Sequence, residues 1–128
     1  MNKYILDASA LLALLNSEPG ADMVEEILPN SVMSTVNVAE VIAELDKRLD
    51  ITSEESKEMV HTLIDHIVPL DFNQAVEIGR LKKPTRDFGL SLGDRACISL
   101  ALSTGYTVYT TDKIWSKLKL QCDIVVIR

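Results

Sequence analysis

The sequence predicts an α/β fold built on a parallel sheet, because short β-branched runs alternate with longer stretches of helical apolar spacing. Its 128 residues are 47% hydrophobic, which is enough to bury the core of one globular domain. The apolar runs are shorter than the roughly 20 residues that a membrane-crossing helix requires. We therefore expect a single domain over residues 1–128, in the cytoplasm and without contact with a membrane.

Five segments are expected to form strands because they are short and rich in β-branched or aromatic residues. In chain order they are residues 4–6, 31–35, 67–69, 107–109 and 124–127. Alternation of such strands with helices favours parallel pairing, since each crossover helix returns the chain to the same end of the sheet.

The segments between the strands have apolar residues three and four positions apart, which predicts helices. They are residues 8–15, 20–28, 36–49, 53–65, 72–81, 92–103 and 112–118. In the third of these, one apolar stripe is formed by Val38, Val41, Ile42, Leu45 and Leu49. The fourth has Ser53 as its expected cap, because Glu54 and Glu55 follow it in the first turn.

Four carboxylates stand at the ends or on the flank of these apolar segments: Asp7, Glu40, Asp94 and Asp112. Asp7 and Asp112 each follow a strand, and the carboxyl ends of parallel strands meet at one edge of the sheet. Asp94 opens an apolar helix, and the side chain of Glu40 is long enough to reach the same edge. Four converging acids would repel one another unless a divalent cation neutralised them. The pattern therefore predicts a Mg²⁺ or Mn²⁺ site.

Each acid taken alone also has an ordinary structural explanation. Asp7 and Asp112 are well suited to cap the helices that follow them, and Asp94 is favoured by the dipole of its helix. Glu40 can equally be a solvated helix residue. The coincidence of all four at one edge favours a functional site over four separate structural roles.

Four pieces of the chain come in the order and approximate spacing of a known family: residues 6–10, 37–40, 90–95 and 110–112. They read Leu-Asp-Ala-Ser-Ala, Asn-Val-Ala-Glu, Leu-Ser-Leu-Gly-Asp-Arg and Thr-Thr-Asp. Over residues 4–126 the chain resembles PIN-domain ribonucleases, specifically VapC-type toxins. The Leu-Gly-Asp-Arg stretch is the most specific of these pieces.

This resemblance implies a PIN-like three-layer α/β fold, with a five-stranded parallel sheet of order 3-2-1-4-5 flanked by about seven helices. It implies a metal-dependent endoribonuclease in which Asp7, Glu40, Asp94 and Asp112 are catalytic and bind Mg²⁺ or Mn²⁺. Three hydroxyls lie beside these acids in the sequence, those of Ser9, Thr110 and Thr111, and Ser9 and Thr111 match family positions that support the acids. The resemblance also implies a homodimer that a cognate VapB-like antitoxin inhibits.

The net charge of −6 is unusual for an enzyme that cuts RNA, because phosphate contacts normally require Lys and Arg. Four basic residues nevertheless lie within seven positions, Arg80, Lys82, Lys83 and Arg86. Our hypothesis is that this segment binds the RNA backbone. The alternative is a solvated loop that serves solubility alone.

Two other functional classes fit part of the pattern. A phosphoacceptor domain of the response-regulator type also gathers acids around Mg²⁺, but it needs adjacent acids after the first strand, and here Ala8 follows Asp7. A non-catalytic α/β module would use the same acids to bind a metal ion or a basic partner. Loss of Asp94 would leave cellular toxicity unchanged if this last interpretation were correct.

Overall fold

A computed structural model describes residues 3–128 as a five-stranded parallel sheet with the strand order β3-β2-β1-β4-β5. The strands are β1 (Tyr4–Leu6), β2 (Ser31–Ser34), β3 (His66–Val68), β4 (Thr107–Thr110) and β5 (Ile124–Val126). Each lies within one residue of a predicted strand at either end, and the predicted order and direction of the sheet are confirmed.

Within residues 3–128 there are six α-helices: α1 (Ala8–Leu15), α2 (Ala21–Ile27), α3 (Thr35–Leu45), α4 (Ser53–Leu63), α5 (Phe72–Arg80) and α6 (Leu92–Thr104). Three short 3-10 helices accompany them, η1 (Leu28–Asn30), η2 (Arg86–Phe88) and η3 (Lys113–Lys117). The expected seventh helix, over residues 112–118, is the 3-10 helix η3, in which Asp112 caps the first turn. The predicted count of about seven is thus corrected to six α-helices in the described part.

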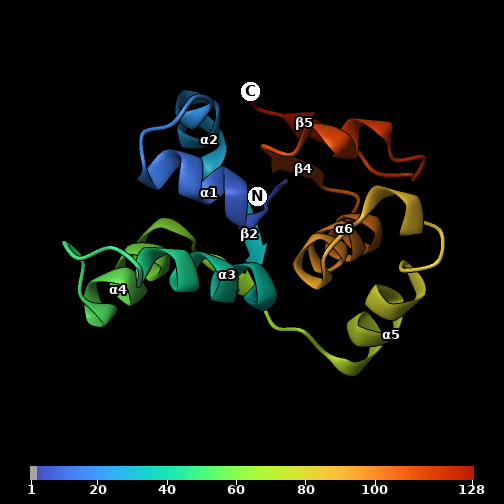
Figure 1. The fold of residues 1–128 in the computed structure, drawn as a ribbon, viewed down its shortest axis with the longest axis horizontal. Helices are drawn as coiled ribbons and strands as arrows, with labels where there is room; N and C mark the ends of the chain where they lie inside the picture. Colours follow the sequence, from blue (N-terminus) through green and yellow to red (C-terminus); the bar gives the residue numbers. More distant parts are fainter. Residues whose placement is uncertain (1–2) are drawn as a thin grey trace.

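The sheet is covered on both faces, with α1 to α4 on one side and α5 and α6 on the other (Figure 1). Neighbouring residues of a strand point to opposite faces. Leu6 and Met33 belong to the core under the first group of helices, whereas Ile5 and Val32 belong to the core under α6. Burial on both faces explains why neighbouring residues of these strands, such as Ile5 and Leu6 or Val32 and Met33, are both apolar instead of alternating with polar ones.

Two predicted details of α3 and α4 were wrong. Helix α3 ends at Leu45, and Leu49 is fully exposed instead of extending the apolar stripe. Just beyond the end of α3, Asp46 Oδ1 accepts a hydrogen bond of 2.9 Å from the hydroxyl of Ser56 in α4. The cap of α4 is Thr52 and not Ser53.

Thr52 caps α4 through two reciprocal hydrogen bonds with Glu55. The hydroxyl of Thr52 accepts from the N–H of Glu55 at 3.1 Å, and the Glu55 carboxylate accepts from the N–H of Thr52 at 3.0 Å. Such a capping box needs a carboxylate or amide side chain three residues after the cap, and Glu55 supplies it for Thr52.

The parallel register brings the ends of β1 and β4 together. Leu6 is paired with Tyr109, and the N–H of Asp7 donates to the carbonyl of Tyr109 at 3.2 Å. The residues after both strands therefore emerge at the same edge of the sheet. Among residues 3–128, no helix has the length and apolarity needed to cross a membrane.

Candidate active site

A pocket of about 600 Å³ opens at this edge of the sheet, and all four predicted acids line it. Asp7 and Asp112 follow β1 and β4, Glu40 comes from α3, and Asp94 from the first turn of α6. Its other lining residues are Ala8, Ser9, Leu12, Ala43, Glu44 and Thr111. The fold thus brings together four carboxylates that lie up to 105 positions apart in the sequence.

Asp7 is the most buried of the four acids, with 6% of its surface exposed. Its Oδ1 atom accepts hydrogen bonds from the hydroxyl of Ser9 at 2.7 Å and from the N–H of Ala10 at 2.9 Å. Its Oδ2 atom accepts from the hydroxyl of Thr110 at 2.6 Å. Asp7 therefore caps α1 and also presents its carboxylate at the floor of the pocket.

Asp112 is exposed and caps η3, accepting a hydrogen bond of 3.0 Å from the N–H of Ile114. Its own N–H donates to the hydroxyl of Thr110 at 3.1 Å. Thr111 contributes its backbone, whose N–H donates to the hydroxyl of Ser9 at 3.0 Å. The threonine hydroxyl that touches the acids is thus that of Thr110.

Glu40 is held by Asn37, whose side-chain amide donates to Glu40 Oε1 at 2.9 Å and to the carbonyl of Gly93 at 3.0 Å. Asp94 forms a capping box with Ser91. Its Oδ2 atom accepts from the N–H of Ser91 at 2.9 Å, and its own N–H donates to the Ser91 hydroxyl at 3.1 Å. The local roles considered for Asp7, Asp94 and Asp112 therefore coexist with a shared pocket.

The four carboxylates share the pocket without forming a ready-made coordination shell. Within the described residues 3–128, no three acidic, histidine or cysteine side chains are placed so as to hold a metal ion together. Each acid instead bonds to donors of its own segment or of a neighbouring strand. The four acids therefore line one pocket, and hydrogen bonds orient each of them. No three of them, within the described residues, are already positioned to coordinate a single ion.

Burial raises the pKa of Asp7 from 3.8 to about 6, and the negative charge of Asp94 adds to the increase. The hydrogen bonds from Thr110, Ser9 and Ala10 act in the opposite direction and favour the ionised form. An acid with this pKa is charged at neutral pH at a cost in free energy, which a bound cation would reduce.

Cys97 lies beneath the pocket and is fully buried. Burial raises the pKa of its thiol well above the usual value, and the charges of Asp7, Asp94 and Glu40 raise it further. The thiol therefore stays protonated at neutral pH, which rules it out as a nucleophile.

Of the four predicted RNA-binding residues, three lie on the connection from α5 to α6 and one in the last turn of α5, and all four are exposed. Arg80 ends α5 and pairs with Glu77 at 3.5 Å. The acidic pocket is lined by none of the four, judged over the described residues. The connection is anchored by buried Thr85, whose hydroxyl donates to the carbonyl of Leu81 at 2.6 Å.

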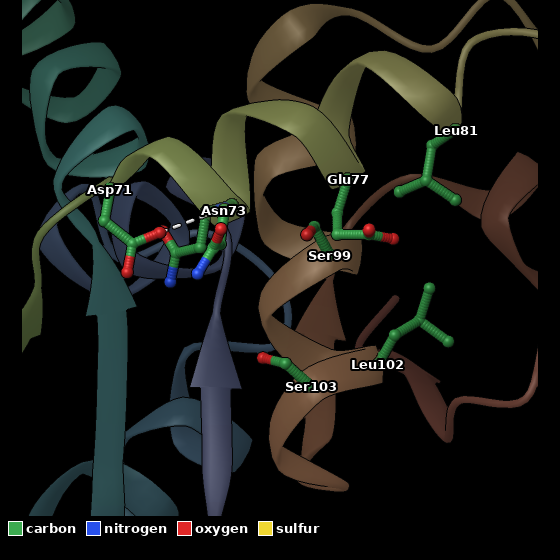
Figure 2. Close-up of a pocket in the computed structure, with 8 residues that line it drawn as sticks. Asp71, Asn73, Glu77, Leu81, Ser99, Leu102 and Ser103 are labelled. Carbon is green, nitrogen blue, oxygen red and sulfur yellow. Dashed lines mark hydrogen bonds between the residues drawn. The ribbon is translucent and has the colours of Figure 1, made fainter.

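A second pocket, of about 450 Å³, lies between α5 and α6 (Figure 2). It also contains two acids, Asp71 and Glu77. Asp71 caps α5 by accepting from the N–H of Gln74 at 2.8 Å, and Glu77 pairs with Arg80. Its acids come from one helix and its cap, whereas those of the first pocket converge from four elements. We therefore take the pocket of Asp7 as the candidate active site.

Sequence reasoning assigned no role to Asn37, and it named Thr110 only as a hydroxyl beside the acids, while the resemblance gave Thr111 as the supporting residue. The signal for Thr110 was available, because it lies two positions after buried Val108 on the same face of β4. The signal for Asn37 was its place three residues before Glu40 on one helix, where side chains are neighbours.

The sheet order and the acidic pocket at its carboxyl edge define an α/β protein of the PIN type. The family model described as PIN domain matches residues 4–120, so the chain belongs to the PIN-domain family. Within it, the chain is 31% identical over 112 residues to VapC ribonuclease Mb2780c of Mycobacterium bovis and to ribonuclease VapC42 of Mycobacterium tuberculosis, covering 79% of this chain and 84% of each relative. These matches place it among the VapC proteins.

Solved structures agree with this assignment at the level of the fold. VapC20 of Mycobacterium tuberculosis, a toxin that cleaves the sarcin-ricin loop, superposes with a TM-score of 0.77 at 15% identity. The DNA-bound VapBC complex of Salmonella typhimurium gives 0.74 at 18% identity. Each comparison covers 98% of both chains. The predicted PIN-like fold is thereby confirmed.

Proposed function

We propose that this chain is a metal-dependent endoribonuclease toxin that cleaves RNA phosphodiester bonds at its acidic pocket, with Mg²⁺ or Mn²⁺ as the cofactor. The observation that carries the proposal is that four carboxylates from four elements, Asp7, Glu40, Asp94 and Asp112, line one pocket. The VapC ribonucleases to which the chain is 31% identical support RNA as the substrate.

The chemistry of the pocket fits a hard divalent cation. Its charged groups are carboxylates, and oxygen ligands are those that Mg²⁺ and Mn²⁺ prefer. When bound, such an ion polarises the phosphodiester, lowers the pKa of a coordinated water and stabilises the leaving oxygen. The raised pKa of Asp7 supports the same conclusion, because a cation would favour its ionised form.

In this proposal the four acids have two different roles. Asp7, Asp94 and Asp112 would hold the principal ion, and Glu40 would hold a second ion or orient the attacking water. That water would form the new bond to phosphorus as the bond to the leaving oxygen breaks, with one of its protons ending on the leaving oxygen, so no protein nucleophile would be needed. The supporting donors are the hydroxyls of Ser9 and Thr110 and the backbone N–H of Thr111.

The substrate would approach a protein of net charge −6, so local positive charge is needed to bind RNA. We assign this role to the exposed residues Arg80, Lys82, Lys83 and Arg86, at the end of α5 and on the connection to α6. The connection leads in sequence into the helix of Asp94, which supports a role for these cations outside the pocket, on RNA that enters it.

The proposal extends to partners and location. Solved relatives include VapBC complexes and a toxin–antitoxin complex from Klebsiella pneumoniae, which supports a VapB-like antitoxin as the inhibitor of this chain. We also propose a homodimer, a single PIN domain over residues 1–128, and a cytoplasmic location.

Cleavage of total cellular RNA by the purified protein tests the proposed activity. Wild type is incubated with Mg²⁺, with Mn²⁺ or with chelator, and compared with the Asp94→Asn variant. The variant keeps a carbonyl oxygen for the capping box with Ser91 but loses the charge. We expect discrete metal-dependent fragments from wild type and a loss of at least about 100-fold in the variant, the upper end of the losses for residues that only support metal ligands.

The matched control is Asp22→Asn, which removes an exposed acid from the first turn of α2, outside the pocket. It should cleave like wild type. A folded wild type that cuts no RNA under any of these conditions, while it binds a basic partner, would instead favour a non-catalytic interaction module.

A further inference from the structure

Asn37 is a buried polar residue that joins two helices next to the acidic pocket. It lies in the first turn of α3 and is 1% exposed. Its amide nitrogen donates to Glu40 Oε1 at 2.9 Å, within α3, and to the carbonyl of Gly93 at 3.0 Å, in α6. One amide group thus fixes the Glu40 carboxylate and ties α3 to the first turn of the helix that carries Asp94.

The chemistry of its two partners determines which way the amide of Asn37 points. A carboxylate and a carbonyl oxygen are both acceptors, so only the NH₂ group, with its two hydrogens, satisfies both of them. The Oδ1 atom of Asn37 is buried and has no hydrogen-bond partner among residues 3–128. Burying an unpaired acceptor is costly, so the two donated bonds, rather than fit to the core, account for a polar side chain at this position.

Gly93 allows Glu40 to lie against the backbone of α6. A Cβ atom at position 93 would stand 2.5 Å from Cδ of Glu40 and would collide with its carboxylate. Gly93 does not have a positive φ, so its backbone conformation does not require glycine. The close approach of Glu40 is therefore the reason that a side chain is excluded here.

We propose that Asn37 is a positioning residue that holds the Glu40 carboxylate against Gly93 for cation binding in the pocket, an inference that rests on the proposed function. Two contacts confine the carboxylate: the hydrogen bond from Asn37 and the close approach to the bare backbone of Gly93. Without them Glu40 is free to move within the pocket, away from Asp94.

The affinity for Mn²⁺, measured by calorimetric titration of the full chain, tests this role. Asn37→Leu removes both donors while it keeps the size and neutrality of the side chain, and Gly93→Ala adds a Cβ atom that would collide with the Glu40 carboxylate. We expect each variant to bind Mn²⁺ about tenfold more weakly, the range seen when residues that orient metal ligands are lost. High Mn²⁺ should then restore RNA cleavage, which it would not do if the variants were merely misfolded.

Two matched controls come from α5. Asn73→Leu makes the same change at an exposed residue of the second pocket (Figure 2). Gly79→Ala adds a Cβ atom that would meet nothing within 4 Å. Both should bind Mn²⁺ within about twofold of wild type, because changes at distant independent sites do not couple.

A double-mutant cycle decides whether Asn37 acts through Glu40. In a Glu40→Gln background, Asn37→Leu should weaken Mn²⁺ binding by less than about twofold, because the group that it positions is already altered. A full tenfold loss in that background would overturn the inference, as would wild-type affinity in the single Asn37→Leu variant.

The contact itself is tested by NMR of the metal-free protein. The side-chain amide hydrogens of Asn37 should exchange with solvent at least about 100-fold more slowly than those of exposed Asn73, since buried bonded groups are protected. Exchange at equal rates would overturn the inference even if Mn²⁺ binds. A wild type that neither binds Mn²⁺ nor cuts RNA would instead refute the proposed function, which distinguishes the two failures.

Discussion

The hydroxyl of Thr110 donates a hydrogen bond of 2.6 Å to Oδ2 of Asp7, across 103 positions of sequence. Thr110 is completely buried at the end of β4, and its hydroxyl also accepts from the N–H of Asp112 at 3.1 Å. A single side chain therefore connects the first acid of the pocket with the segment that carries the last. Its position depends on the parallel pairing of β1 with β4.

Replacing Thr110 with Val should destabilise the protein by about 1–3 kcal/mol at neutral pH, because a buried carboxylate oxygen loses its donor. The hydrogen bond from Thr110 lowers the pKa of Asp7, which means that it favours the ionised form. The loss should therefore shrink near about pH 4.5, where Asp7 is mostly protonated. Urea denaturation at the two pH values measures the difference.

Two variants are the controls for this measurement. Thr110→Ser keeps the hydroxyl and should retain most of the stability that Thr110→Val loses. Thr111→Val should change little, since Thr111 contributes its backbone N–H to the site. Equal stability of Thr110→Val and wild type at both pH values would show that the hydroxyl does not support Asp7.

The positions of the acids could be predicted because a parallel sheet leaves little choice. Residues that follow β1 and β4 must emerge at one edge, so Asp7 and Asp112 are brought together by topology alone. The ends of helices were less certain, since tertiary contacts decide them. Helix α3 ends before Leu49, and just beyond its end Asp46 bonds to Ser56 of α4, a pairing of which neither residue carries a signal in the sequence.

The contacts between elements that are distant in sequence could not be predicted. Nothing in the local pattern around Asn37 indicates that its amide reaches Gly93, 56 positions away. The local sequence also does not indicate why position 93 is a glycine, because the reason is that Glu40 occupies the space that a side chain would need. Local spacing thus predicted which residues carry charge at the site, and packing decided which residues hold them in place.

Asp7→Asn should stabilise the metal-free protein above about pH 6. Burial raises the folded-state pKa of Asp7 from 3.8 to about 6, so the folded state binds more protons than the unfolded state between these values. Stability then falls as the pH rises from about 4 to about 6, by at most about 3 kcal/mol for a shift of about 2 units. A neutral Asn avoids this penalty, although it abolishes the proposed catalysis.

Thermal unfolding of wild type and Asp7→Asn in the presence of chelator, from about pH 4 to about pH 8, measures the effect. The gain in the variant should grow between about pH 4 and about pH 6 and then level off. Asp22→Asn, at an exposed position of α2, should show no such growth. If the variant were less stable than wild type at neutral pH, the hydrogen bonds that ionised Asp7 accepts would stabilise the fold by more than the burial of its charge destabilises it.

Charge reversal on the connection from α5 to α6 should weaken RNA binding. Lys82→Glu, Lys83→Glu and Arg86→Glu are each expected to lower the slope of log affinity against log salt by about 1, as the loss of one phosphate contact does. The measurement uses fluorescence anisotropy in the Asp94→Asn background, so that the RNA stays intact. The control is Lys57→Glu, which makes the same change at an exposed residue of α4. If the three variants had the same salt slope as this control, the connection would be a solvated loop without a role in RNA binding.

The affinity for Mn²⁺ should depend on pH through Asp7, because a carboxylate must lose its proton before it can bind a cation. With a folded-state pKa of about 6, Asp7 is largely ionised at pH 7 and about one-tenth ionised at pH 5. Binding should therefore weaken by about tenfold between these values. In Thr110→Val the lost hydrogen bond raises the pKa of Asp7 further, so the same weakening should begin at a higher pH. Calorimetric titrations of both proteins at several pH values test this shift, and two superimposable profiles would show that Thr110 does not control the protonation of Asp7.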